Sequence, residues 1–131
     1  MKRETKTIDA CPCGGGAYAG CCGRYVDGGE AAPNAETLMR SRYTAYTLGR
    51  ESYLLATWYA STRPPTLDLD STPAPKWLGL EVKRHQQQDD GHAIVEFVAR
   101  YKVGGRALRM HEVSRFVRED GRWYYVDGVV A

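Results

Sequence analysis

The fold is decided by residues 89–130, DDGHAIVEFVARYKVGGRALRMHEVSRFVREDGRWYYVDGVV. Three turn signals, Asp89-Asp90-Gly91, Gly104-Gly105 and Asp120-Gly121, separate runs rich in β-branched and aromatic residues, which favour strands. An alternating run also precedes the first turn. The pattern predicts four antiparallel strands linked by hairpins, one from Lys76 to the first turn and the others over residues 92–103, 106–118 and 122–130.

The alternation in the first strand predicts which of its side chains share a face of the sheet, because successive side chains of a strand point to opposite faces. One face is expected to carry Leu78, Leu80 and Val82. The opposite face is expected to carry Trp77, Gly79, Glu81 and Lys83.

Helical signals precede the strands. Asn34 is a good N-cap residue, and Gly49 is a typical C-terminal stop. We therefore expect one helix from Ala35 to Leu48 and a second, shorter helix over residues 51–59. Prolines make residues 62–75 an irregular connection. Helices followed by hairpin-linked strands predict an α+β fold, a curved four-stranded antiparallel sheet covered by helices on one face.

Length and composition are those of one globular domain. The chain has 131 residues, 43% of them hydrophobic and 26% charged, with a formal net charge of +2. This small charge gives no strong signal for nucleic acid, and no apolar run reaches the roughly 20 residues of a membrane span. The polar residues 1–9 lack the hydrophobic stretch of a signal peptide. We therefore expect a flexible tail there and a cytoplasmic location.

All four cysteines lie within residues 11–22, at Cys11, Cys13, Cys21 and Cys22. Buried structural cysteines would be scattered through the core, and a reducing cytoplasm disfavours disulfides. Four thiolates in one loop can close a tetrahedral zinc shell, with sulfur about 2.3 Å from the metal. We therefore expect a zinc-ordered cysteine knuckle over residues 10–30 and an α+β domain over residues 31–131. A thiol cluster without metal is the alternative.

The cysteine pattern resembles a known metal motif. Cys11-Pro12-Cys13-Gly14-Gly15-Gly16, followed by Cys21-Cys22-Gly23, is similar to the SEC-C zinc motif found at the tail of the translocation ATPase SecA. The usual motif has eight residues between its cysteine pairs, whereas this chain has seven, Gly14 to Gly20. The resemblance implies zinc bound by the four thiolates, and glycines allow the left-handed turns that a tighter loop needs.

Elements beyond the cysteines resemble the YchJ-type family of bacterial proteins in order and spacing. The matching elements are Leu38-Met39-Arg40-Ser41-Arg42-Tyr43, Tyr53-Leu54, Thr57-Trp58, Trp77-Leu78-Gly79-Leu80, Val95-Glu96-Phe97, His111-Glu112, Ser114-Arg115-Phe116 and the run Gly121 to Gly128. The resemblance covers nearly all of residues 10–129. It implies a nuclear-transport-factor-2-like (cystatin-like) cone, in agreement with the predicted order of helices and strands.

Six side chains are candidates for a pocket inside such a cone: Arg42, Tyr43, Trp58, Trp77, His111 and Glu112. His111-Glu112 does not continue into the HExxH pattern of zinc peptidases, because Arg115 stands where the second histidine is needed. Either residue of the pair could act as a general base or ligand anchor, or form a structural ion pair. Arg42 could likewise bind an anionic ligand or pair with an acidic side chain.

The expected function is that of a non-enzymatic interaction or adaptor module, and no catalytic residue is assigned. A metal shell closed by four thiolates leaves no open coordination position, so we expect the knuckle to offer a rigid surface to a protein or ribosome partner. The alternative is a small-molecule binder or enzyme that uses the cone pocket. A homodimer formed through the exposed face of the sheet is a further expectation.

Overall fold

The computed structural model describes residues 10–67, 69 and 74–131, and the tail predicted for residues 1–9 lies outside this range. Four strands form one antiparallel sheet in the order β1-β2-β3-β4. These strands are β1 (Lys76–Asp89), β2 (His92–Val103), β3 (Arg106–Glu119) and β4 (Arg122–Val130). The predicted strands and the α+β fold are confirmed.

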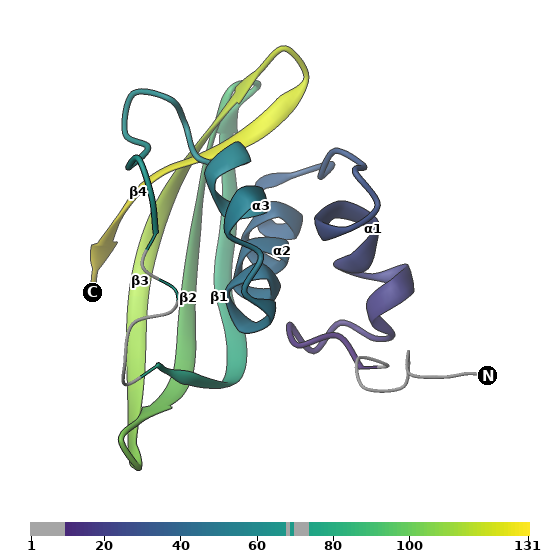
Figure 1. Cartoon of the computed structure of the whole chain (residues 1–131). Helices are drawn as coiled ribbons and strands as arrows, with labels where there is room; N and C mark the ends of the chain where they lie inside the picture. The colour runs from purple at the N-terminus through teal and green to yellow at the C-terminus, as the bar shows by residue number, and fades with distance from the viewer. Residues whose placement is uncertain (1–9, 68, 70–73) are drawn as a thin grey trace, which may run out of the picture.

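Helices cover one face of this curved sheet (Figure 1). The long helix α2 (Ala35–Leu48) packs against β1, β2 and β4, and α3 (Glu51–Ala56) follows it. The cysteine segment contains the 3-10 turn η2 (Tyr18–Gly20) and the short helix α1 (Gly23–Val26). This segment lies on the side of α2 that faces away from the sheet, so α2 forms a middle layer. None of the helices in the described ranges is long and apolar enough to cross a membrane.

The ends of α2 are those predicted from its sequence. The side-chain oxygen of Asn34 accepts a hydrogen bond of 2.8 Å from the backbone N–H of Thr37, which satisfies a donor of the first turn. At the other end Gly49 adopts the left-handed conformation, with φ of 72°. The N–H of Arg50 then donates to the carbonyl of Ala45, which closes the helix.

The second helix is shorter than predicted, which is a correction. It ends at Ala56 rather than at residue 59, and the chain continues beside β4. The N–H of Tyr59 donates to the carbonyl of Tyr125 at 2.7 Å, and the N–H of Tyr125 donates to the carbonyl of Thr57 at 2.8 Å. Hydrogen bonds to the sheet edge therefore replace the last turn of the helix.

The face prediction for the first strand is also corrected. A β-bulge between Trp77 and Gly79 interrupts the alternation, and Leu78 is left 49% exposed. Trp77 therefore joins Leu80 and Val82 on the face that packs against the core, where strict alternation had separated them.

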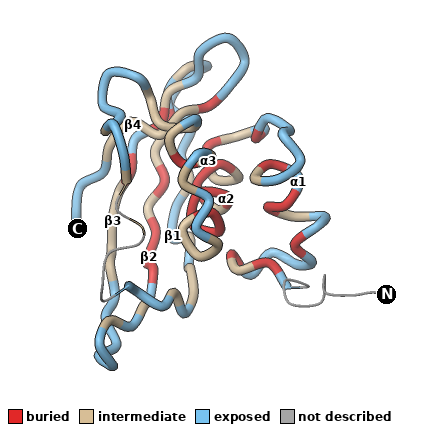
Figure 2. The backbone as a smooth tube through the Cα atoms, viewed as in Figure 1, coloured by how far each residue is buried: buried red, intermediate tan, exposed pale blue. Residues whose placement is uncertain are grey.

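The hydrophobic core runs without a break from the sheet through α2 to the cysteines. Phe97 and Phe116 from the sheet, Leu38 from α2 and Tyr25 from α1 belong to one buried cluster. Figure 2 shows buried backbone on β2, on α2 and on the cysteine segment. The buried cluster therefore extends across the boundary predicted near residue 30.

Candidate metal centre and cavities

The four cysteine sulfur atoms converge on one point. All four Sγ atoms lie within 4.8 Å of one another. The Sγ of Cys13 is 3.6 Å from that of Cys11 and 3.5 Å from that of Cys21. Sulfur atoms that bind one tetrahedral ion at about 2.3 Å lie about 3.8 Å apart, so this set fits a metal ion with little adjustment. The cluster could therefore hold a metal ion.

Glycines allow the shortened loop to bring the cysteine pairs together. Gly14 and Gly16 have φ values of 86° and 122°, in the region that side chains disfavour. A Cβ atom at Gly15 would lie 3.0 Å from the Sγ of Cys21 and 3.3 Å from that of Cys13. A side chain at position 15 would therefore crowd the sulfur atoms. Seven residues between the cysteine pairs are enough to bring the sulfur atoms together because Gly14, Gly15 and Gly16 have no side chains.

Helix α2 supplies polar contacts to the cysteine loop. The hydroxyl oxygen of Thr44 is 3.6 Å from the Sγ of Cys11, and both groups are buried. The guanidinium of Arg40 donates to the carbonyl of Cys13 at 3.2 Å and is also paired with Glu36 at 3.0 Å. A metal-bound thiolate can only accept hydrogen bonds, so Thr44 would be the donor in the metal-bound state.

The thiols shift one another's pKa values. A hydrogen bond from Cys22 lowers the pKa of Cys13 to about 5, against the opposing effect of burial. Burial raises the pKa of Cys21 to about 11. The hydrogen bond to Cys13, together with burial, raises the pKa of Cys22. Without a cation, the cluster therefore favours a single thiolate, that of Cys13, which accepts hydrogen bonds from the other thiols. A divalent cation would favour the thiolate form of all four cysteines.

A small cavity lies between α2 and the inner face of the sheet. Its volume is about 90 Å³. Its lining consists of Met39, Arg42, Tyr43, Tyr46, Phe97, Glu112, Ser114 and Tyr125. Three predicted pocket residues, Arg42, Tyr43 and Glu112, therefore meet here. Pockets for small molecules usually measure about 300–1,000 Å³, so this cone cavity suits a few water molecules rather than a metabolite.

Arg42 is a buried cation held by neutral groups. Its guanidinium donates to the carbonyl of Leu54 and to the hydroxyl of Thr57, both at 2.7 Å. It also lies over the rings of Trp58 and Tyr125, at 5.0 and 4.6 Å from their centroids. Burial lowers the pKa of Arg42, but a guanidinium stays charged at neutral pH. These contacts tie α2 to α3 and β4.

Glu112 faces the same cavity from β3. Its carboxylate accepts hydrogen bonds from the hydroxyls of Ser114, at 2.6 Å, and Tyr125, at 3.4 Å. Gly128 on the neighbouring strand makes room for it, because a Cβ atom there would overlap the carboxylate. The carboxylate is therefore held by neutral donors, and the described residues offer it no cation within 4 Å.

The remaining pocket candidates lie elsewhere. Trp58 stacks on Arg42, and Trp77 packs edge-on against Tyr43, with 5.7 Å between the ring centroids. His111 lies on the opposite face of the sheet, with Nε2 2.7 Å from the Glu96 carboxylate. The sequence prediction of a cavity position for His111 is therefore corrected, and His111 contacts an acidic side chain instead.

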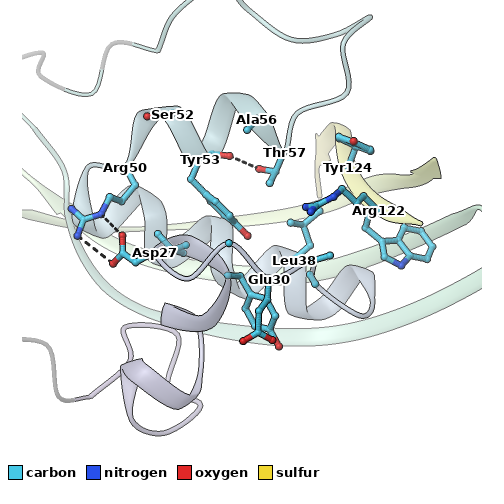
Figure 3. A pocket seen from close by; sticks show the side chains of 16 residues that line it. Asp27, Glu30, Leu38, Arg50, Ser52, Tyr53, Ala56, Thr57, Arg122 and Tyr124 are labelled. Carbon is cyan, nitrogen blue, oxygen red and sulfur yellow. Dashed lines mark hydrogen bonds and ion pairs between the residues drawn. The ribbon is translucent and has the colours of Figure 1, made fainter. Parts of the chain in front are cut away.

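A larger cavity, of about 450 Å³, lies between the cysteine segment, α3 and β4 (Figure 3). Its walls come from residues 25–32, from Leu38 and residues 50–57, and from Arg122, Trp123 and Tyr124. Sequence reasoning missed this cavity because its walls are far apart along the chain.

Comparisons with known proteins agree with this architecture. A family profile described as the YchJ middle NTF2-like domain matches residues 34–128. The chain belongs to the YchJ family. It is 61% identical to a YchJ relative, the UPF0225 protein of Chromobacterium violaceum, over 100% of both chains. It is 63% identical to the UPF0225 protein of Cupriavidus metallidurans, over 90% of this chain and 86% of that one.

Two solved structures extend the YchJ comparison to the cysteine segment. A SEC-C motif containing protein from Rhodopseudomonas palustris matches with a TM-score of 0.82 and 34% identity, over 92% of this chain and 98% of that chain. A second SEC-C motif containing protein, from Psychrobacter arcticus, matches with a TM-score of 0.77 and 30% identity, over 95% of this chain and 84% of that chain. The predicted YchJ-type family, SEC-C motif and NTF2-like fold are therefore confirmed.

Proposed function

We propose that the protein is an adaptor in which a zinc-bound cysteine knuckle, held on an NTF2-like domain, presents a rigid surface to a protein partner. The observation that carries this proposal is the convergence of four cysteine sulfur atoms within 4.8 Å of one another. Two of the sulfur separations, 3.5 and 3.6 Å, are close to those of a tetrahedral thiolate site.

Zinc is the proposed metal because of the donor set. Four thiolates in tetrahedral geometry are typical of structural zinc sites and of iron–sulfur centres, and the SEC-C resemblance favours zinc. Cys11, Cys13, Cys21 and Cys22 would hold the ion, which would be the cation that stabilises four thiolates together. Since protein thiolates would fill every position, no site would remain for a reactive water, and the role would be structural.

The proposed partner surface is the outer side of the cysteine loop. Residues 14–17, 19 and 20 are exposed, while Cys11, Cys13 and Cys22 are buried beneath them. Short glycine-rich backbone at this surface leaves peptide groups accessible for pairing with another chain. A ribosome-bound protein is one such partner, and a reducing compartment such as the cytoplasm would keep the thiols available.

The test is metal analysis of protein purified without added zinc. The expected result is about one zinc per chain in the unaltered protein and none in Cys13→Ser. Ser52→Ala, an exposed hydroxyl far from the thiols in sequence, serves as the control and should keep its zinc. A well-folded protein that contains no metal would contradict the proposal.

The adaptor role has its own readout. Immobilised protein should retain a specific partner that Cys13→Ser loses, while circular dichroism shows that the sheet of the variant persists. Retention of the same partner by both proteins would contradict a role for the knuckle surface without affecting the metal result.

A further inference from the structure

The cavity of about 450 Å³ between the cysteine segment and the NTF2-like domain has the size of a small-molecule site. Residues 25–32 form one wall because the chain folds back after α1. Gly29 has a φ of 77°, and the N–H of Glu30 donates to the carbonyl of Arg24 at 3.0 Å. The opposite walls are α3 and the start of β4.

The two carboxylates that line this cavity already have partners. Asp27 accepts hydrogen bonds from Arg50 at 3.1 Å and from the hydroxyl of Tyr18 at 2.5 Å. Glu30 is paired with Arg24 at 2.9 Å. These partners lower the pKa of both carboxyl groups, so both are ionised at neutral pH. The charge of each carboxylate is balanced by its arginine partner. They add no net demand for a cationic ligand.

Arg122 is the cation of the lining for which the described residues provide no partner. Among the residues that the structure describes, its guanidinium has no carboxylate within 4 Å and no side-chain hydrogen bond. Figure 3 shows it extending from β4 toward the α3 wall, near Thr57 and Tyr53. A guanidinium binds a planar carboxylate through two parallel hydrogen bonds. In the described part of the chain, this one unpaired cation of the lining matches a ligand with a single negative charge.

Aromatic side chains supply the apolar part of the cavity. Tyr25 and Trp123 are buried, and Tyr53 and Tyr124 are partly buried in its walls. The hydroxyl of Tyr53 is 2.7 Å from that of Ser41, which fixes the orientation of its ring. Rings arranged in this way favour a planar aromatic body through stacked or edge-on contacts.

We propose that this cavity binds a small aromatic carboxylate, whose charge pairs with Arg122 and whose ring lies among Tyr25, Tyr53 and Trp123. The site is distinct from the thiol cluster and contains none of the proposed metal ligands. It is also distinct from the cone cavity that holds Arg42. The ligand would contact the cysteine segment and the NTF2-like domain together, so it would stabilise their packing.

The test titrates the full chain with indole-3-acetate and with its uncharged analogue indole-3-acetamide, and follows backbone amides by NMR. For a ligand of this size the expected dissociation constant of the carboxylate is on the order of 1 mM. The shifted amides should centre on residues 25–32, 52–57 and 122–124. The amide analogue should bind at least about 10-fold more weakly, because it cannot form the charge-assisted pair.

Three variants complete the experiment. Arg122→Gln should weaken carboxylate binding at least about 10-fold, whereas Arg118→Gln, an exposed arginine of the same hairpin outside the cavity, should bind like the unaltered protein. Ala56→Phe should fill the cavity and abolish binding of both compounds while distant amides keep their shifts. Equal affinity for both compounds, unchanged binding by Arg122→Gln, shifts centred elsewhere or no carboxylate binding at tens of millimolar would each overturn the proposal. The zinc content of the same samples is measured separately, so failure of ligand binding can be distinguished from failure of the metal proposal.

Discussion

The cysteine segment, residues 10–32, and the NTF2-like domain, residues 35–131, are stabilised by different means. The domain buries large apolar side chains such as Val95, Phe97 and Phe116 between α2 and the sheet. The cysteine segment buries mainly its thiols and the rings of Tyr18 and Tyr25. Burial of apolar surface stabilises the NTF2-like domain, whereas the cysteine segment would gain most of its order from a bound metal.

Helix α2 joins the two regions because it is buried on opposite sides. Met39 and Tyr43 face the sheet, and Thr44 and Arg40 contact the cysteine loop. Loss of order in the cysteine segment would therefore expose Thr44, Arg40 and part of the shared core, including Leu38, whereas Met39 and Tyr43 would stay covered by the sheet. We therefore expect the domain to stay folded when the knuckle does not.

The largest expected effect follows from a cavity in the domain core. Phe116 is 1% exposed and packs edge-on against Tyr125. Phe116→Ala should lower the free energy of unfolding by about 3–5 kcal/mol, because truncation removes apolar burial and leaves a void. Urea unfolding at fixed zinc concentration measures this change in the free energy of unfolding. Leu108→Ala, on the same strand but 38% exposed, is the control, and equal losses in the two variants would contradict the core assignment.

A smaller loss is expected when the buried guanidinium is replaced. Arg42→Lys keeps the charge but removes the planar group that lies over Trp58 and Tyr125. The unfolding free energy should fall by about 2 kcal/mol, since a compact ammonium stacks poorly and costs more to bury. The exposed Arg100→Lys should change it by less than about 0.5 kcal/mol. A neutral effect at Arg42 would show that its contacts do not hold α2 to α3.

The link between the two regions can be weakened at one hydroxyl. Thr44→Val preserves the shape of the side chain but removes the donor next to the Sγ of Cys11. Zinc affinity, measured by competition with a chromogenic chelator, should fall about 10-fold, as is common when outer hydrogen bonds to metal ligands are lost. Thr44→Ser should restore the affinity. An unchanged affinity in Thr44→Val would mean that α2 positions the loop by packing alone.

The smallest effect concerns the ion pair of the cysteine segment. Arg50 holds the pKa of Asp27 below its usual 3.8, so the stabilisation by this carboxylate is present above that value and is lost as pH falls through the lowered pKa. Asp27→Asn should cost less than about 1 kcal/mol near pH 7, because the pair is largely exposed. The difference in thermal unfolding between the two proteins should shrink below about pH 4. A difference independent of pH would contradict the assignment.

Much of the fold could be predicted because its signals are local. Turn dipeptides and alternating runs give the strands, and Asn34 and Gly49 mark the ends of α2. The bulge at Leu78 could not be predicted, since nothing in the local pattern of alternation indicates an extra residue. The shortened helix α3 could not either, because its last turn is replaced by pairing with Tyr125, which lies far along the chain.

The cysteine cluster could be predicted as a site because its four ligands are neighbours in sequence. Its contact with α2 could not, because Thr44 is a small polar residue that a helical pattern assigns to solvent, whereas it is buried next to Cys11. The cavity near Arg122 was likewise hidden, since three distant segments build it. Contacts between distant segments are the part that a single sequence conceals.

Amide hydrogen exchange with and without a zinc chelator tests the central contrast most directly. Chelation should remove protection from residues 11–26 and leave β2 and β3 protected, with the NTF2-like domain still folded. Equal protection of the cysteine segment in both conditions, or loss of protection throughout the sheet on chelation, would contradict this contrast.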